Sequence, residues 1–107
     1  MSWKISFYNS KVEKLTLGFP SGILANFLHI VELIEEFGPS IGRPYIGTLG
    51  NGLYEIRARG KEGIGRSIYC TIKGTEIVIL KSFIKKSNKT PINELRIAKQ
   101  RQKEILR

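Results

Sequence analysis

The sequence predicts a compact, single-domain α+β fold in which helices flank an antiparallel sheet of about four strands. The 107 residues match the commonest size of one domain, and 41% hydrophobic and 25% charged residues are typical of a globular chain. Short runs with β-type patterning are separated by turn signals, and two segments with helical periodicity flank them. No linker, repeat or low-complexity segment interrupts the chain, so we expect one domain over residues 1–107.

The N-terminal half is expected to hold one strand and one long helix. The alternating, aromatic run WKISFY suits a strand, whereas residues 9–22, NSKVEKLTLGFPSG, are rich in turn formers and predict no helix. A helix is predicted from residue 20 or 21 to about residue 37, where Gly38-Pro39 ends it. Its apolar side is unusually broad, which suggests contact with the sheet and with a partner. Residues 39–50 are expected to form a loop.

The C-terminal half is expected to hold three strands and a second helix. The strands are predicted at residues 53–59, 64–73 and 76–84, with tight antiparallel connections between them. The unbroken apolar run IVIL predicts that the last strand is covered on both faces. Thr90-Pro91 predicts the start of the terminal helix, with Thr90 as its N-cap and Pro91 in its first turn.

Charge is distributed unevenly along the chain. The net charge is +9, yet in residues 1–50 four Lys or Arg balance four Glu, so the whole excess lies in residues 51–107. This asymmetry favours a polyanionic partner such as nucleic acid or an anionic membrane surface; a basic surface that only confers solubility is the alternative. The longest apolar stretch is too short and too polar to span a bilayer, and the N-terminus lacks the apolar core of a signal peptide.

Cysteine and histidine usage argues against metal or disulfide chemistry. The chain has one cysteine, Cys70, and one histidine, His29, which provide neither an internal disulfide nor a set of zinc ligands. We therefore expect no metal and no cofactor. Cys70 lies in an apolar-alternating run and is expected in the core of a protein of the reducing cytoplasm.

Basic residues recur on the predicted strands. In LYEIRARG, the alternation of a strand places Glu55, Arg57 and Arg59 on one face, opposite an apolar face. Arg66 lies on the next strand, and the pair Lys85–Lys86 ends the last one, so these cations can converge on one basic cleft. Arg66 shares its parity with residues that resemble core, so a bulge near Gly65, or a position at the frayed start of the strand, is needed to turn it toward this cleft.

A phosphate-binding surface of this kind is able to support RNA cleavage by the 2′-hydroxyl, because preorganised cations stabilise the charge of the transition state. Acid–base residues are scarce, however. His29 is expected in the core or on the helix surface. Glu55 could act as a base, but pairing with Arg57 or Arg59 is the simpler interpretation. Tyr69 and Tyr54 could stack on bases or donate a proton, or they could pack in the core.

The motifs from residue 24 to 106 resemble the HigB-type, phage-derived branch of the RelE toxin superfamily. They are GLYEIR (52–57), the Arg66-x-x-Tyr69 strand, the apolar strand ending in FIKK (83–86), Thr90-Pro91 and the Ala98-x-x-Arg101 helix. Many relatives also carry a short helix after the first strand, which residues 9–22 do not predict here.

The resemblance implies a RelE-like, microbial-RNase-like fold and a toxin of a type II toxin–antitoxin system. Such a toxin is an endoribonuclease that enters the ribosomal A site and cuts mRNA in the cytoplasm, and a helix-turn-helix, HigA-like antitoxin inhibits it. Carried over by position, the catalytic candidates are Arg57, Arg66, Lys85 and Lys86. The additional RNA-binding candidates are Arg59, Lys81, Lys89 and Tyr69. Two alternatives remain, a non-catalytic nucleic-acid-binding module and a degenerate toxin that retains only antitoxin binding.

Overall fold

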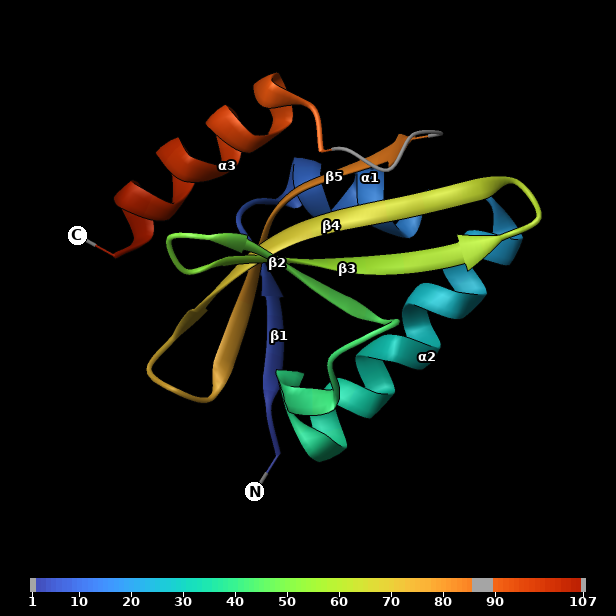
Figure 1. Cartoon of the computed structure of the whole chain (residues 1–107), viewed down its shortest axis with the longest axis horizontal. Coiled ribbons are helices and arrows are strands. Elements are labelled where there is room, and N and C mark those ends of the chain that lie inside the picture. The colour runs from blue at the N-terminus through green and yellow to red at the C-terminus, as the bar shows by residue number, and fades with distance from the viewer. Residues whose placement is uncertain (1, 86–89, 107) are drawn as a thin grey trace.

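The structure, a computed structural model, describes residues 2–85 and 90–106, and within them a five-stranded sheet lies between helices (Figure 1). The strand order is β1-β5-β4-β3-β2; β1 is parallel to β5 and the other neighbours are antiparallel. The elements are β1 (Lys4–Phe7), α1 (Ser10–Leu17), α2 (Ser21–Phe37), the short 3₁₀ helix η1 (Pro39–Ile41), β2 (Ile46–Gly50), β3 (Leu53–Gly60), β4 (Gly63–Ile72), β5 (Glu76–Lys85) and α3 (Ile92–Ile105).

The α+β class is confirmed, and the predicted strands correspond to β1, β3, β4 and β5. The turns between the antiparallel strands follow from their sequence. Asn51 and Gly52 both have positive φ, 56° and 79°, as do Lys73 and Gly74, at 53° and 75°. Two successive residues with positive φ match the twist of a hairpin, and Asn-Gly adopts this conformation easily.

Two elements were missed by the sequence analysis. Residues 39–50 were expected to form a loop, yet β2 pairs with β3. Its two glycines weaken strand patterning, so β2 depends on its partner strand. Residues 9–22 were expected to lack a helix, yet the Asn9 side chain accepts a hydrogen bond from the Val12 N–H and caps α1. The short helix that the resemblance implies after the first strand is therefore present.

The sheet is covered on both faces, but by different helices. On one face, α2 packs its buried residues against β3, β4 and β1; these residues are Ile23, Phe27, Ile30 and Ile34. On the other face, α3 packs Ala98 and Leu95 over a second cluster; its buried strand residues are Leu53, Ile68, Cys70, Val78 and Leu80. The predicted burial of Cys70 and of both faces of β5 is confirmed.

The broad apolar side of α2 is not fully buried within the domain. Leu28 and Phe37 are 45% and 61% exposed, so the suggestion that this helix also contacts a partner stays a prediction. No single helix within the described residues is long and apolar enough to cross a membrane; α1 and α2 reach that length only as a pair, bent by 117°.

Candidate functional site

Arg57 of β3 and Arg66 of β4 lie directly opposite each other in the sheet. The β3–β4 ladder is regular from Tyr54↔Tyr69 to Gly60↔Gly63, so both side chains are on the face that α3 partly covers. The ladder has no bulge near Gly65, and Arg66 is the fourth residue of β4 rather than part of a frayed start, so the expectation that one of these features is needed was wrong. One face of β4 therefore carries both core residues and the polar site. The core cluster under α3 contains Ile68 and Cys70 but does not extend to Arg66.

The irregularity lies instead in the pairing of β5. Ile68 is opposite Lys81, but Tyr69 is opposite Ile79, so Leu80 is an extra residue on β5. An extra residue reverses the side-chain alternation that follows it. As a result, Lys81, Phe83 and Lys85 share the face of Arg66. Without the extra residue, these side chains would point to the α2 side.

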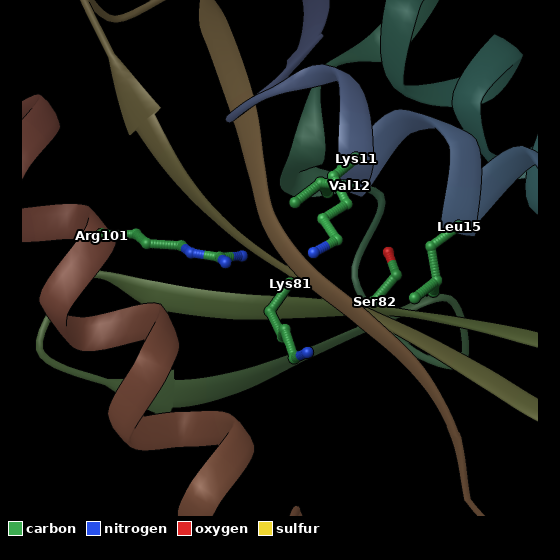
Figure 2. A pocket seen from close by; sticks show the side chains of 6 residues that line it. All are labelled: Lys11, Val12, Leu15, Lys81, Ser82 and Arg101. Atoms are coloured by element: carbon green, nitrogen blue, oxygen red, sulfur yellow. The ribbon is translucent and has the colours of Figure 1, made fainter.

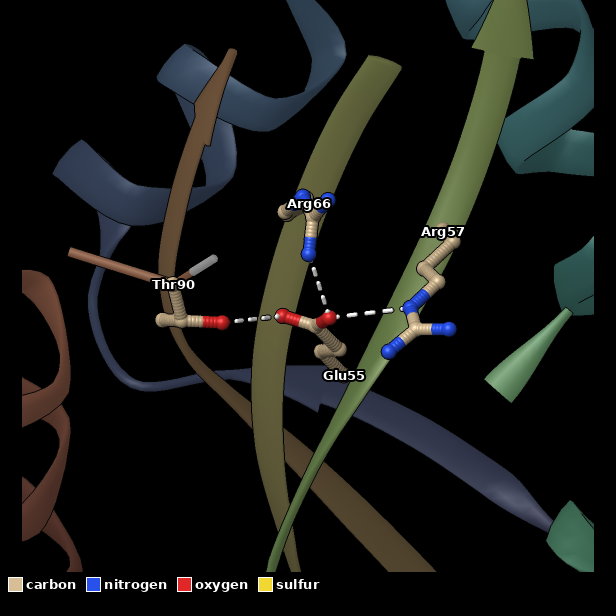
Figure 3. A network of polar contacts seen from close by, with 4 residues as sticks. All are labelled: Glu55, Arg57, Arg66 and Thr90. Atoms are coloured by element: carbon tan, nitrogen blue, oxygen red, sulfur yellow. Dashed lines mark hydrogen bonds and ion pairs between the residues drawn. The ribbon is translucent and has the colours of Figure 1, made fainter. Parts of the chain in front are cut away.

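Glu55 connects the arginines (Figure 3). Its Oε1 accepts hydrogen bonds from Nη1 of Arg66 at 2.7 Å and from Nε of Arg57 at 2.9 Å. Its Oε2 accepts a hydrogen bond from the Thr90 hydroxyl at 3.0 Å. The Glu55 side chain is 0% exposed, so without these partners its charge would be strongly destabilising. We call Glu55, Arg57, Arg66 and Thr90 the Glu55 cluster.

Thr90 was expected to cap the terminal helix. Instead, Pro91 is the N-cap of α3, no side chain caps it, and the Thr90 hydroxyl bonds to Glu55. This bond ties the segment before α3 to the middle of β3. The interpretation of Glu55 as an ion-pair partner is confirmed for Arg57, and the second partner is Arg66 rather than Arg59.

Gly47 of β2 leaves space for the Arg57 guanidinium. Gly47 lies opposite Glu55, and a Cβ atom at position 47 would be 2.6 Å from Cζ of Arg57, much closer than atoms normally approach. The guanidinium therefore lies flat over the backbone of β2. Its Nε faces Glu55, while 29% of the side chain remains exposed. Sequence reasoning missed Gly47 because β2 was not predicted.

The other predicted cations occupy different surroundings. Arg59 is exposed. It pairs with Ile64 of β4, which pairs in turn with Lys85 of β5, so these three residues form one row across the strands. Lys81 belongs to the row of Glu55 and lies 3.7 Å from the Glu94 carboxylate on α3. The structure therefore gathers Arg57, Arg59, Arg66, Lys81 and Lys85 on one face. Lys86 and Lys89 lie outside the described residues.

Tyr69 is not brought to this site. It is 1% exposed, belongs to the core cluster under α2, and stacks on Tyr54 with a ring-centroid distance of 5.6 Å. Burial raises the pKa of the Tyr69 phenol. Its parity places it on the face opposite Arg66, so the prediction that Tyr69 binds RNA directly does not fit the fold.

The side chains gathered at the site offer cationic stabilisation. Among residues 2–85 and 90–106, no group of three or more His, Cys, Asp or Glu side chains could hold a metal ion. His29 is exposed on α2, whose buried side packs against the opposite face of the sheet. The arrangement can bind a phosphate through the exposed part of Arg57, with Arg66 buried behind it.

Comparison with known proteins places the chain in a family. Residues 16–103 match the phage-derived, Gp49-like protein family (DUF891). The chain belongs to this family. The matched part of this Gp49-like protein contains the whole Glu55 cluster, Gly47 and the β5 bulge. No curated protein matches the chain.

A solved structure supports the fold of the Gp49-like protein. The chain is similar to one in the crystal structure of the archaeal RelE–RelB complex from Pyrococcus horikoshii OT3, with a TM-score of 0.57 and 25% identity. The similarity covers 78% of this chain and 96% of that chain. The predicted RelE-like architecture and the phage-derived family are thus confirmed, with five strands in place of about four.

Proposed function

We propose that this Gp49-like protein is the toxin of a type II toxin–antitoxin system, of the HigB type, and that it is an endoribonuclease. Its substrate is mRNA in the ribosomal A site, and it acts in the cytoplasm. The observation that carries the proposal is the Glu55 cluster, in which one buried carboxylate holds two arginines on a RelE-like sheet. A fixed pair of guanidinium groups is suited to a phosphate whose charge increases during reaction.

The proposed reaction is attack by a ribose 2′-hydroxyl on the adjacent phosphate. The O2′–P bond forms as the 2′-hydroxyl loses its proton to solvent water, and the P–O5′ bond breaks as the leaving O5′ takes up a proton from water. The products are a 2′,3′-cyclic phosphate and a 5′-hydroxyl. Arg57, with its exposed edge, binds the phosphate oxygens, and Arg66 adds positive charge from behind. Lys85 and Lys86 are proposed to add further positive charge that stabilises the transition state.

Glu55 is a positioning residue in this proposal. Its two oxygens already accept three hydrogen bonds, and its side chain is 0% exposed, so it is poorly placed to accept the proton of a ribose hydroxyl. Its role is to fix the rotamers of Arg57 and Arg66 before RNA arrives, so that no ordering is needed during the reaction.

RNA outside the scissile phosphate is proposed to contact the other basic residues, Arg59, Lys81 and Lys89. Because these contacts are electrostatic, affinity for RNA should fall steeply as salt increases. The proposed protein partner is a cognate antitoxin with a helix-turn-helix, HigA-like fold. The similar structure from Pyrococcus is that of a complex with RelB, which supports a partner of this general kind.

One observation favours a non-catalytic alternative. Arg66 is only 3% exposed, so a direct contact between its guanidinium and RNA would require movement of a neighbouring group. A module that binds RNA without cutting it, or a degenerate toxin, needs no such access. The alternative uses Arg57 and the lysines as point charges.

A reconstituted translation reaction with one defined message separates these functions. Purified wild-type protein is expected to cut the message when ribosomes translate it and to leave the naked message intact. Cutting of naked RNA would retain the nuclease and remove the ribosome from the proposal. Binding without cutting under both conditions would favour the non-catalytic module.

A further inference from the structure

A groove runs along β5 between α1 and α3 (Figure 2). Two adjoining cavities of about 160 Å³ and 360 Å³ share Leu15, Lys81 and Ser82 in their linings. Neither lining includes Arg57 or Arg66, so the groove is separate from the Glu55 cluster. It nevertheless reaches the row of Glu55 through Lys81.

The topology of the sheet leaves this groove open. β1 pairs with β5 only as far as Phe7↔Ile79, and α1 then takes its place beside β5. α1 turns Val12 and Thr16 inward, where the Thr16 hydroxyl contacts the Ser82 hydroxyl at 2.6 Å. Lys11 and Leu15, one helical turn apart, are left on its exposed side and line the groove.

One end of the groove is basic. Lys11, Lys81 and Arg101 line the smaller cavity. Arg101 is held in place by the fold, since its Nη1 donates to the carbonyl oxygen of Leu80 at 2.6 Å and its guanidinium lies 4.7 Å from the centre of the Tyr8 ring. A cation fixed in this manner offers an anchor to a carboxylate with little loss of side-chain entropy.

The other end is largely apolar and open to solvent, and the one carboxylate in its lining, Glu94, lies 3.7 Å from Nζ of Lys81. Leu15 and Ile84 are 49% and 46% exposed, and with Phe19 and Phe83 they line the larger cavity. Neighbouring exposed apolar side chains favour a protein partner over a nucleic acid, whose backbone would leave them in contact with charge. The charge of the chain, +9, favours an acidic partner.

We propose that this groove is the docking site of the antitoxin, for a segment that offers a carboxylate to Lys11 and Arg101 and an apolar side chain to Leu15 and Ile84. The inference rests on the proposed function, because it names the surface through which that partner binds. A segment in the groove lies beside Lys81, in the row of Glu55, and therefore restricts the approach of RNA to the same face.

The test measures binding of the purified cognate antitoxin, by calorimetry, to the wild type and four variants. Lys11→Glu and Leu15→Glu change the groove side of α1, and Lys14→Glu and Leu17→Glu are matched controls on exposed positions outside both linings. Each groove variant is expected to weaken binding at least tenfold, while the controls change it less than about threefold. Thermal melting checks that all five proteins fold.

The outcomes separate the groove from the proposed function. Tight binding of the wild type and of both groove variants would overturn the groove and leave the toxin intact. One further variant, Leu28→Glu on α2, is measured and melted in the same way; weakening by this variant, but not by the groove variants, would move the partner to α2. Groove variants that lose RNA cleavage but keep the partner would make the groove an RNA site. No binding by the wild type would overturn the docking inference, while cleavage in the translation reaction would still test the nuclease.

Discussion

Nη1 of Arg66 donates to Oε1 of Glu55 at 2.7 Å, in a pair whose side chains are 3% and 0% exposed. The same oxygen accepts the Nε–H of Arg57. The single negative charge of Glu55 therefore balances one of the two arginine charges. The remaining positive charge is exposed through Arg57. The stability of the fold and the proposed binding of phosphate thus depend on the same carboxylate.

Removal of the Glu55 carboxylate is expected to destabilise the fold strongly. Glu55→Ala leaves Arg66 buried without its anion, and loss of one partner of a buried ion pair costs about 3–5 kcal/mol. Glu55→Gln keeps the shape and should cost less. Urea unfolding followed by circular dichroism measures the free energy of unfolding. Glu13→Gln on the exposed side of α1 is the control, and a loss below about 1 kcal/mol in Glu55→Ala would contradict the role of the cluster.

Gly47→Ala is expected to impair activity more than stability. The added methyl group displaces the Arg57 guanidinium, and a displacement of about 1 Å in a catalytic group can reduce the rate on the order of 10²-fold. The measurement is cleavage of a translated message, with the melting temperature followed in parallel. Thr48→Ala, an exposed neighbour on β2, should retain the wild-type rate. Equal rates in both variants would show that the position of Arg57 does not matter.

Arg57→Lys distinguishes an enzyme from a charged binding surface. Lysine keeps the charge but loses the planar fork and the Nε–H that bonds to Glu55. An enzyme should lose on the order of 10²-fold in cleavage rate, whereas affinity for RNA should change little. Arg96→Lys, at an exposed position of α3, is the control. Similar cleavage by Arg57→Lys and the wild type would speak against a guanidinium-specific role.

The Glu62 carboxylate is expected to make the stability of the fold dependent on pH. Pro20 gives α2 no side-chain cap, and the Glu62 oxygens instead accept the N–H groups of Gly22 at 3.0 Å and Ile23 at 3.2 Å. These bonds, chiefly that from Gly22, lower the pKa of Glu62 below its ordinary value of 4.5. A depressed pKa means that the stabilisation is fully present above about pH 4.5 and is lost as the pH falls through the pKa of the folded state.

Comparison of the wild type with Glu62→Gln in urea, from pH 7 downward, tests this expectation. The wild type should be the more stable protein at pH 7, and the difference should shrink as the pH decreases below about 4.5. Glu36→Gln, at an exposed position of α2, provides the control for a general effect of charge. A difference that stays constant over this range would mean that Glu62 does not cap α2 through its charge.

The sequence predicted the side of the sheet on which Arg57 lies and its pairing with Glu55, but it did not predict the contributions of Arg66 and Gly47. Alternation alone places Glu55 and Arg57 on one face, whereas the partner of a strand residue depends on register. Arg66 lies on the same face of β4 as the core residues Ile68 and Cys70. Only the position of α3 shows that this face holds both core residues and the site. The extra residue Leu80 turns Lys81 and Lys85 toward the face of Arg66. The order of apolar and polar residues in β5 does not reveal it.

Local sequence patterns also failed to predict features that depend on tertiary contacts. α1 has a capping residue and two inward positions, Val12 and Thr16. One of the two is polar, while the apolar Leu15 and Leu17 are exposed, so the helical pattern is concealed. Gly47 looks like a loop residue until Arg57 lies over it. Tyr69 belongs to a motif that the resemblance associates with activity, yet its parity buries it under α2.

The most direct test of the nuclease is to map mRNA 5′ ends by primer extension after brief expression of the wild type and of Arg57→Ala. New ends within the codons of translated messages, absent from the Arg57→Ala sample, are the expected result. Both proteins must accumulate equally and melt as folded domains, so that loss of the ends reports on the site. New ends that persist in Arg57→Ala would contradict a nuclease that depends on the Glu55 cluster. So would the absence of new ends when folded wild-type protein is expressed.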